Sequence, residues 1–381
     1  MQRLKVITIV GTRPEIIRLS RVMNKLDEFT EQIIVHTGQN YDYELNEIFW
    51  NDLELRKPDH FLNADTSSLG ATLGDILNKT EKVLKEAKPD ALLVLGDTNS
   101  CLSAYIAKRM HIPVFHMEAG NRSFDMNVPE ETNRKIIDHL ADFNLVYTEH
   151  ARRHLLAEGL SHRRIYLTGS PMKEVLDYYK NKIQSSKALS ELDLVRKGYF
   201  LVSVHREENV DNADNLRTIL STMNAMVEKY NLPLIVSTHP RTRKRIENIR
   251  DQEALELNPL IQFMKPFGFF DYINLQMNAQ CVISDSGTIS EESSILGFPA
   301  ISLRQSMERP EAQDTGSMIL SGLHKETVIP CVEYVTQEFT MYEGNHPVPA
   351  DYTVTDTSNR VVKLILGNTK LSNKWWGINQ K

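Results

Sequence analysis

The chain has 381 residues, of which 41% are hydrophobic and 25% charged, and its formal net charge at pH 7 is -6. This length exceeds what one compact core usually serves, so we expect two domains. A net negative charge argues against nucleic acid or an anionic membrane surface as the main partner, because both demand a basic excess.

The cysteines and the apolar runs indicate the compartment. Cys101, Cys281 and Cys331 lie far apart and form no C-x-x-C pair, which argues against a disulfide framework or a zinc–thiolate site. The apolar run 6–10 is too short for the hydrophobic region of a signal peptide. No apolar run approaches the roughly 20 residues needed to cross a bilayer. We therefore expect a cytoplasmic protein that does not bind membranes.

Short apolar runs rich in β-branched residues recur along the chain, each followed by a segment long enough for a helix. They are almost continuously apolar, as expected of strands buried on both faces. This pattern predicts an α/β protein with two doubly wound parallel sheets. The predicted strands are 5–10, 32–37, 91–95, 113–117, 144–147 and 164–167 in the first half, and 199–204, 233–238, 261–265, 281–284 and 299–303 in the second.

A polar stretch near 177–197 interrupts this rhythm and indicates the boundary between two domains, 1–176 and 177–365. The last residues, 366–381, include Trp375 and Trp376. Because adjacent tryptophans are rarely left in water, we expect this tail to pack back on the first domain. Ligands of such folds bind at the carboxyl ends of the strands, so a cleft between the two domains is the expected site.

Gly11-Thr12-Arg13-Pro14-Glu15 directly follows the first predicted strand. Glycine permits a tight turn and proline suits the first turn of a helix. Arg13, with Arg18 one turn further on, would place positive charge beside a helix N-terminus and form an anion site. The alternative is an ordinary strand-to-helix turn with surface arginines.

Neither common nucleotide fingerprint occurs in the chain. No two of its 17 glycines lie two residues apart, so a G-x-G-x-x-G motif cannot be drawn, and the P-loop pattern is also absent. Both absences disfavour tight use of NAD or ATP, and we expect no cofactor.

A second candidate anion site follows the predicted strand 281–284. Ser286, Gly287 and Thr288 open a predicted helix, whose free backbone N–H groups would hold a diphosphate. Glu292, one turn inside, could accept hydrogen bonds from a ribose diol. The alternative is a well-capped helix whose acidic residues favour its positive end.

Three carboxylates lie where predicted elements begin or end. Asp97 and Glu118 follow strands, and Glu130 starts a helix. Removing a proton from one face of a sugar ring and returning it to the other needs two positioned acid/base groups, which carboxylates can supply. Each residue alone is better explained by capping or ion pairing, but three at strand or helix ends that face one cleft favour chemistry.

Histidines follow two strands of the second half, His205 in HREEN and His239 in HPRTR. With the neighbouring arginines they could neutralise a departing diphosphate. The alternative is a pair of satisfied loop histidines. His150 and His154 have the spacing of metal ligands on a helix, but no further ligand accompanies them and Arg152 and Arg153 would repel a cation, so we assign no metal site.

Seven motifs resemble, in order, the non-hydrolysing UDP-N-acetylglucosamine 2-epimerases: GTRPE at 11–15, GDT at 96–98, EAG at 118–120, PEETNR at 129–134, HREEN at 205–209, DSGTISEE at 285–292 and ERPEA at 308–312. The resemblance covers nearly the whole chain. It implies two Rossmann-like domains of glycosyltransferase-B type, UDP bound mainly by the second, and a homodimer. It also implies inversion at C2 of a UDP-linked amino sugar, and we expect this inversion to proceed by elimination and re-addition of UDP.

The resemblance also assigns residues by motif. Asp97, Glu118 and Glu130 match the acid/base carboxylates, and His205 matches the active-site histidine. The residues it assigns to substrate binding are Arg13, Arg18, Arg122, Arg134, His239, Ser286, Gly287, Thr288 and Glu292.

Within the family, blocks such as HMEAGNRSFD, VSVHREEN and SDSGTISEESS look closer to the branch that makes UDP-N-acetyl-L-fucosamine from UDP-2-acetamido-2,6-dideoxy-L-talose, for capsule or O-antigen synthesis. The alternative substrate is UDP-GlcNAc, giving UDP-ManNAc. A glycosyltransferase of the same architecture is a more distant alternative. The stretch 118–130 is shorter than in typical UDP-GlcNAc enzymes, and Asn40-Tyr41-Asp42 stands where bacterial relatives have a histidine and arginine linked to activation by substrate, which puts that regulation in question.

Overall fold

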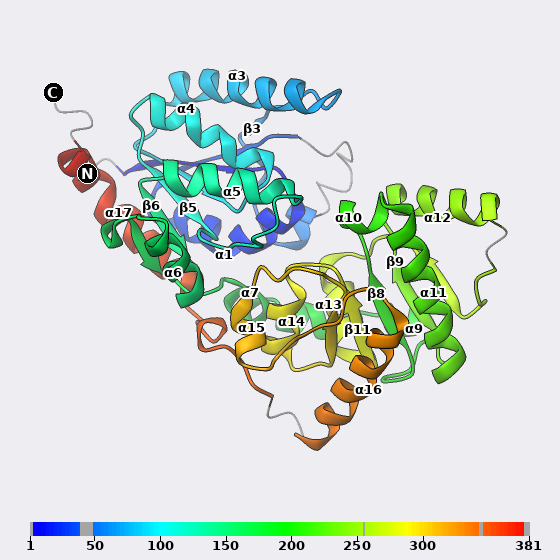
Figure 1. The fold of residues 1–381 in the computed structure, drawn as a ribbon. Helices are drawn as coiled ribbons and strands as arrows, with labels where there is room; N and C mark the ends of the chain where they lie inside the picture. The colour runs from blue at the N-terminus through cyan, green and yellow to red at the C-terminus, as the bar shows by residue number, and fades with distance from the viewer. Residues whose placement is uncertain (1–2, 39–48, 254–255, 343–345, 377–381) are drawn as a thin grey trace. The chain divides into compact units, whose positions relative to one another are not determined.

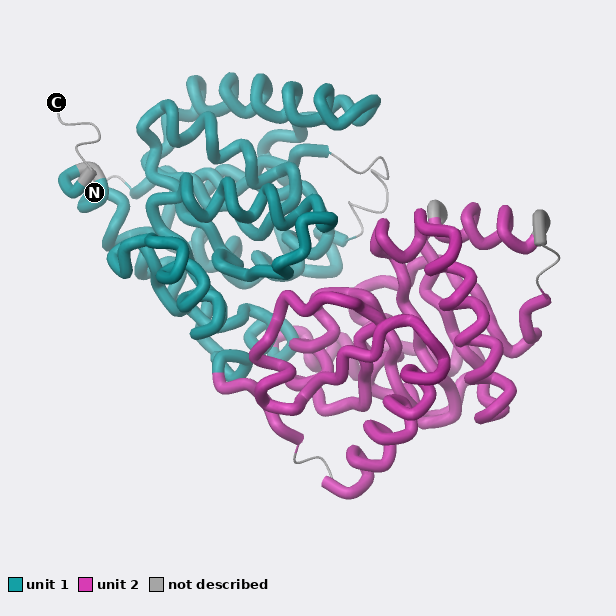
Figure 2. The backbone as a smooth tube through the Cα atoms, viewed as in Figure 1, with its two compact units in different colours: residues 1–177, 351–381 teal, residues 178–350 magenta. Residues whose placement is uncertain are grey.

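The computed structural model describes residues 3–38, 49–253, 256–342 and 346–376. The expectation about activation through residues 40–42 falls outside them. The chain forms two compact units, unit 1 from residues 1–177 and 351–381 and unit 2 from residues 178–350 (Figure 2).

In its described residues, unit 1 contains a seven-stranded parallel sheet in the order β3-β2-β1-β4-β5-β6-β7. The direction in which strands are added reverses between β1 and β4, which is where such sheets bind ligands. Val6, Ile7, Ile9 and Val10 of β1 are at most 1% exposed, as the continuous apolar run predicts. The strands are β1 (Lys5–Val10), β2 (Glu31–His36), β3 (His60–Phe61), β4 (Ala91–Leu95), β5 (Val114–Met117), β6 (Phe143–Val146) and β7 (Ile165–Leu167).

The helices of unit 1 join its parallel strands. Helices α3, α4 and α5 pack on one another in turn, while α1 packs against the C-terminal helix α17 (Figure 1). The helices are α1 (Arg13–Phe29), α3 (Leu69–Ala87), η1 (Asn99–Ser103), α4 (Ala104–Arg109), α5 (Pro129–Leu140), α6 (Glu149–Ala157), η2 (His162–Arg164), α7 (Met172–Tyr178), η3 (Ala350–Tyr352) and α17 (Thr357–Trp376). None of the described helices is long and apolar enough to span a membrane.

The segment 351–365 belongs to unit 1, which corrects the sequence-based boundary that placed it in the second domain. The reason is a set of hydrogen bonds near its start. The carbonyl of Asp351 accepts from the backbone N–H of Ser170 (3.1 Å), and the Thr357 hydroxyl donates to the carbonyl of Ser170 (3.1 Å). These bonds hold the returning chain beside the end of β7.

The end of α17 also lies on unit 1. The guanidinium of Arg163, in η2, lies 5.4 Å from the ring centroid of Trp375, a cation–π contact. Trp375 is 37% exposed, so its ring is only partly covered within this chain.

In its described residues, unit 2 repeats this topology with six parallel strands in the order β10-β9-β8-β11-β12-β13. Here the reversal lies between β8 and β11. The strands are β8 (Phe200–Ser203), β9 (Leu234–Ser237), β10 (Ile261–Met264), β11 (Cys281–Ser284), β12 (Ala300–Ser302) and β13 (Ile319–Leu320). The helices are α8 (Lys180–Gln184), α9 (Ala188–Glu191), α10 (Glu207–Val210), α11 (Ala213–Tyr230), α12 (Pro240–Glu253), α13 (Phe269–Asn278), α14 (Ile289–Leu296), α15 (Pro310–Asp314) and α16 (Lys325–Met341).

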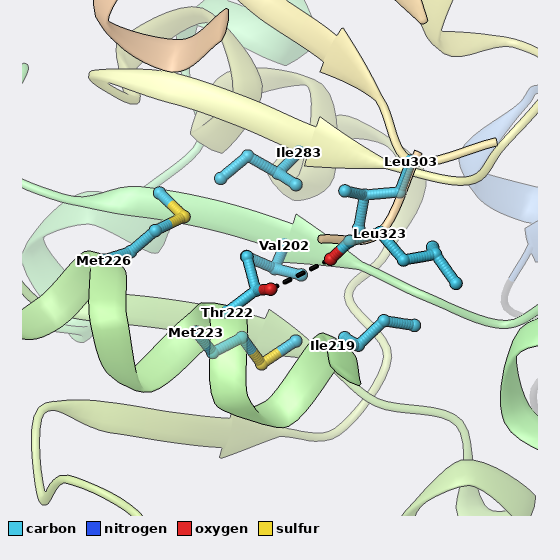
Figure 3. Close-up of a pocket in the computed structure, with 8 residues that line it drawn as sticks. All are labelled: Val202, Ile219, Thr222, Met223, Met226, Ile283, Leu303 and Leu323. Atoms are coloured by element: carbon cyan, nitrogen blue, oxygen red, sulfur yellow. Dashed lines mark hydrogen bonds between the residues drawn. The ribbon is translucent and has the colours of Figure 1, made fainter. Parts of the chain in front are cut away.

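One side of the unit 2 sheet packs against α11 around a small cavity (Figure 3). The Thr222 hydroxyl donates a hydrogen bond to the carbonyl of Leu323 (2.9 Å) and so ties α11 to the chain that follows β13. The other side chains that line the cavity are apolar: Val202, Ile219, Met223, Met226, Ile283, Leu303 and Leu323.

Candidate active site

A buried carboxylate joins the loops that follow β1 and β4, the two strands at the reversal point of unit 1. Glu15 Oε2 accepts hydrogen bonds from the backbone N–H groups of Gly11 (2.8 Å) and Thr12 (2.6 Å). Its Oε1 accepts from the hydroxyls of Thr98 (3.0 Å) and Ser100. Burial raises the pKa of Glu15, although these hydrogen bonds oppose the shift. Glu15 therefore fixes both loops from the first turn of α1.

Four residues predicted for the site form one charged network beside these loops. Arg18 of α1 pairs with Glu118. Arg134 of α5 pairs with Asp97, and its Nη2 lies 3.2 Å from Glu118 Oε1. The side chains of both arginines and of Glu118 are at most 9% exposed, whereas that of Asp97 is 17% exposed. Two guanidinium groups thus balance two carboxylates where β4 and β5 end.

The backbone of the EAG motif is unusual at both ends. Glu118 has φ of 61°, a left-handed conformation that is costly for a residue with a side chain and is often found at functional sites. Arg134 Nη1 donates to the Glu118 carbonyl (2.5 Å) and braces this conformation. A Cβ atom on Gly120 would lie 2.4 Å from the carbonyl oxygen of Ala151, so only glycine fits there.

The two acidic residues in the first turn of helix α5 lie in different surroundings. Glu130, predicted as an acid/base group, is exposed in the first turn. Glu131 is 3% exposed and accepts hydrogen bonds from the backbone N–H (3.0 Å) and hydroxyl (3.2 Å) of Ser123. Glu131 therefore anchors the loop between Glu118 and Glu130, while Glu130 faces outward.

Arg122 and Arg13 lie in different surroundings. The Arg122 side chain is fully buried and forms two 2.7 Å hydrogen bonds with Glu158 and one with Asp138. These contacts engage the Arg122 guanidinium within unit 1, and the substrate contact that its motif predicted stays a prediction. Arg13 is half-buried at the start of α1, with its guanidinium 5.9 Å from the ring centroid of Phe49.

In unit 2 a buried carboxylate again joins the two central loops, those after β8 and β11. Asp285 is 0% exposed, accepts from the backbone N–H groups of His205 (3.1 Å) and Arg206 (3.0 Å), and lies 3.0 Å from His205 Nδ1. Burial would raise the pKa of Asp285, but His205 and these hydrogen bonds lower it to about 2. The His205 side chain is 50% exposed, so Asp285 orients a ring that is open to a ligand.

The comparisons with known proteins decide the family. A family model described as UDP-N-acetylglucosamine 2-epimerase matches residues 23–366. The chain belongs to the UDP-N-acetylglucosamine 2-epimerase family.

Two solved structures and one curated relative illustrate this membership. The UDP-N-acetylglucosamine 2-epimerase from Rickettsia bellii is 45% identical with a TM-score of 0.91, over 98% of this chain and 100% of that one. The UDP-GlcNAc 2-epimerase from Methanocaldococcus jannaschii, in complex with UDP-GlcNAc and UDP, is 35% identical with a TM-score of 0.88, over 95% and 99%. The UDP-2,3-diacetamido-2,3-dideoxy-D-glucuronate 2-epimerase from Pseudomonas aeruginosa is 33% identical over 86% of this chain and 90% of that protein.

These findings confirm the family, its two Rossmann-like units and isomerase activity on a UDP-sugar. The two solved structures are named for UDP-GlcNAc, and so favour the alternative substrate over the L-talose derivative that was expected first.

Three further predicted ligand residues of this epimerase, Ser286, Gly287 and Thr288, lie directly before α14. This helix begins at Ile289, later than expected, because residues 287–288 form a turn. The N–H of Ser286 donates to the Ser284 hydroxyl (3.0 Å) and that of Thr288 to the Ser286 hydroxyl (3.3 Å). Two of the N–H groups assigned to a diphosphate are thus engaged by side chains in this structure.

Glu292 and His239 differ in burial. Glu292 is 6% exposed and accepts a hydrogen bond from Gln276 Nε2 (2.7 Å). Burial, and then the negative charge of Glu292, raise the pKa of the neighbouring Tyr272. His239 is exposed after β9, and its carbonyl accepts from the N–H of Arg243 (3.0 Å).

Arg206, Arg304 and Glu308 surround Gly287. Of these, the sequence indicated only Arg206, as an arginine beside His205, and gave no role to Arg304 or Glu308. Glu308 Oε1 lies 2.6 Å from Arg304 Nη2 and 3.3 Å from Arg206 Nη1. The available signals were position, since Arg304 follows the predicted strand 299–303, and the ERPEA motif, which contains Glu308. Among the described residues, no group of three or more His, Cys, Asp or Glu side chains is placed to hold a metal ion.

Proposed function

We propose that this epimerase interconverts UDP-GlcNAc and UDP-ManNAc by inverting C2, without a cofactor. The observation that carries the proposal is the network of Arg18, Glu118, Arg134 and Asp97 at the reversal point of the unit 1 sheet. It combines charged carboxylates with arginines that hold them in place, as acid/base chemistry on a sugar requires.

The hydrogen on C2 has no neighbouring carbonyl, so a carboxylate of ordinary pKa, about 4.3, cannot remove it directly. Breaking the bond between C1 and the UDP oxygen gives an oxocarbenium-like carbon that acidifies C2. One carboxylate takes the C2 proton, a C1–C2 double bond forms, and UDP leaves with the bonding electron pair. A proton then returns to the other face of C2, and the UDP oxygen bonds to C1 again. Asp97, Glu118 and Glu130 are the candidates for these proton transfers.

Unit 2 would hold the nucleotide during this cycle. Arg206 and Arg304, with His205 oriented by Asp285, offer positive charge and donors to a diphosphate. Glu292 offers two acceptor oxygens to the ribose diol. Keeping UDP bound is what allows re-addition instead of release. We also propose a homodimer in the cytoplasm, which light scattering of the purified protein and cell fractionation would check.

UDP-2-acetamido-2,6-dideoxy-L-talose is a second candidate substrate. It is favoured by the sequence blocks around Glu118, His205 and Ser286. The Pseudomonas aeruginosa relative is named for a further UDP-sugar, which is consistent with variation of the sugar within the family.

The test is proton NMR of the purified protein with each UDP-sugar in deuterated water. We expect conversion of UDP-GlcNAc to UDP-ManNAc with one deuterium at C2 and no accumulation of UDP. A product without deuterium at C2 would contradict the elimination scheme. Turnover of the L-talose derivative alone would select the second candidate, and release of UDP at every turnover would indicate a glycosyltransferase or hydrolase.

A further inference from the structure

Three charged side chains of unit 2 converge on Gly287, just before α14. A Cβ atom built on Gly287 would lie 3.4 Å from Glu308 Oε2, 3.6 Å from Arg206 Nη2 and 3.7 Å from Arg304 Nη1. These side chains come from different loops, Arg206 from the one after β8 and the other two from the one after β12. The fold therefore gathers them at the position where family motifs place the diphosphate.

The charges in this cluster are largely withdrawn from solvent, and a second carboxylate, Glu208, lies 3.9 Å from Arg206 Nη1. The side chains of Arg304, Glu308 and Arg206 are 3%, 13% and 17% exposed. Glu308 is the carboxylate that lies between the two guanidinium groups. Arg304 Nε is buried and has no hydrogen-bond partner in the described part of the chain, and a buried donor left in this way is costly. Arg304 Nε is thus a donor that a further anion could satisfy.

We propose that Glu308 is an internal counter-ion of Arg206 and Arg304, and that the diphosphate of UDP takes its place. The inference rests on the proposed function, because it assumes that UDP is the ligand of unit 2. A diphosphate carries more negative charge and more acceptor oxygens than a carboxylate and suits the planar donors of arginine. Glu308 and UDP would then compete for the same guanidinium groups, so Glu308 lowers the affinity for UDP and eases release of the product.

The loop itself is held without Glu308. Arg309 Nε donates to the Gly287 carbonyl (2.9 Å), and its Nη2 lies 3.2 Å from the buried Glu291. Glu308→Gln should therefore remove a charge while the loop keeps its anchor.

The experiment is titration calorimetry of the full chain with UDP, inorganic pyrophosphate and uridine. We expect Glu308→Gln to bind UDP and pyrophosphate about fivefold more tightly than the wild type, the effect of losing a competing charged hydrogen bond. Binding of uridine, which has no phosphate, should not change. Arg304→Gln should weaken UDP and pyrophosphate at least about tenfold. The matched control is Glu333→Gln, which removes an exposed carboxylate of unit 2 paired with Lys229 (2.8 Å) and should leave all three affinities unchanged.

Weaker or unchanged binding of UDP by Glu308→Gln would overturn the inference, since Glu308 would then orient the arginines or have no part in the site. If Glu308→Gln does not fold, Glu308→Asp replaces it, because this variant keeps the charge but shortens the side chain. We expect Glu308→Asp to bind UDP more tightly than the wild type. Unchanged or weaker binding by this variant would also overturn the inference. If the wild type binds UDP and epimerises the sugar while neither variant binds more tightly, only this inference fails. A wild type that does not bind UDP overturns the proposed function as well.

Discussion

The regions at the strand ends of the two units have the same topology but differ in the charged side chains that they gather. In unit 1, at the ends of β4 and β5, two carboxylates, Asp97 and Glu118, are held by two arginines. In unit 2, between β8 and β11, guanidinium groups meet around Gly287, with Glu308 between them. The repeated fold thus determines where ligand-facing residues lie, and the residues that follow each strand determine whether the place suits proton transfer or anion binding.

Each region also contains a buried carboxylate that joins its two central loops. Glu15 is surrounded by neutral donors, and its pKa is raised by burial. Asp285 is placed beside His205, and its pKa is lowered to about 2 despite burial. Glu15 and Asp285 thus both join two loops, but folding makes Glu15 harder to ionise and Asp285 harder to protonate.

The largest expected effect is at Glu118 of unit 1, and it tests whether this unit carries the proton transfer. We expect Glu118→Gln to lower the rate of epimerisation by about 10³-fold, the usual effect of removing an acid/base group, while UDP affinity stays close to that of the wild type. The measurements are NMR turnover and calorimetry with UDP. Glu81→Gln is the matched control, because it removes an exposed carboxylate of unit 1 that pairs with Lys85. Unchanged turnover of Glu118→Gln would remove this residue from the chemistry.

Acid should destabilise unit 1 before unit 2. Burial lowers the pKa of His36, at the end of β2, from 6.5 to about 4. Between pH 6.5 and about pH 4, His36 is protonated in the unfolded chain but not in the folded protein. The free energy of unfolding therefore decreases as the pH falls through this range. The loss is about 3 kcal/mol.

Tryptophan fluorescence can follow this effect because all three tryptophans, Trp50, Trp375 and Trp376, belong to unit 1. Urea unfolding at pH 6.5, 5.5 and 4.5 would give the free energy of unfolding. His36→Phe, which keeps an aromatic ring against Phe61 (centroids 4.6 Å apart), should flatten the slope. An equal slope in both proteins would exclude His36 as its source.

The sequence predicted the sheets well, and its failures have physical causes. Each predicted strand is present within one residue at either end, because a strand buried on both faces needs an unbroken apolar run. The edge strands β3 and β13 were missed because two residues carry no pattern.

The sequence predicted the candidate site only in part, because local patterns place single residues but not the contacts between them. Position after a strand identified Asp97 and Glu118, but not that Arg134 would contact both. Motif membership could not show that Arg122 is fully buried, or that Glu308 would lie between Arg206 and Arg304. Those facts depend on contacts between distant segments, which no local pattern encodes.

Asp285 gives a corresponding loss of stability in acid for unit 2, but at lower pH than His36. Since its pKa falls from 3.8 to about 2 on folding, its contribution is complete above pH 3.8 and disappears as the pH falls toward 2. This contribution is about 2 kcal/mol. Urea unfolding followed by circular dichroism should show Asp285→Asn less stable than the wild type by that amount at pH 6, with the gap narrowing at pH 3. A gap that does not depend on pH would mean that lost packing, not charge, explains the variant.

The smallest expected effect is a change of stability in the core of unit 2 that leaves binding at its strand ends unchanged. Thr222→Val removes the hydroxyl that donates to Leu323 (Figure 3) but keeps the shape of the side chain in an apolar cavity. The free energy of unfolding should fall by about 1 kcal/mol, the usual net value of one hydrogen bond. UDP affinity should not change, because the cavity lies on the α11 side of the sheet, whereas the charged cluster follows β8, β11 and β12. Met223→Leu, a volume-conserving change in the same cavity, is the control for packing alone. The contradicting outcome is a changed UDP affinity in Thr222→Val together with an unchanged UDP affinity in Met223→Leu. It would show that the Leu323 carbonyl helps to position the loops that bind the nucleotide. The core and the binding site of unit 2 would then not be independent.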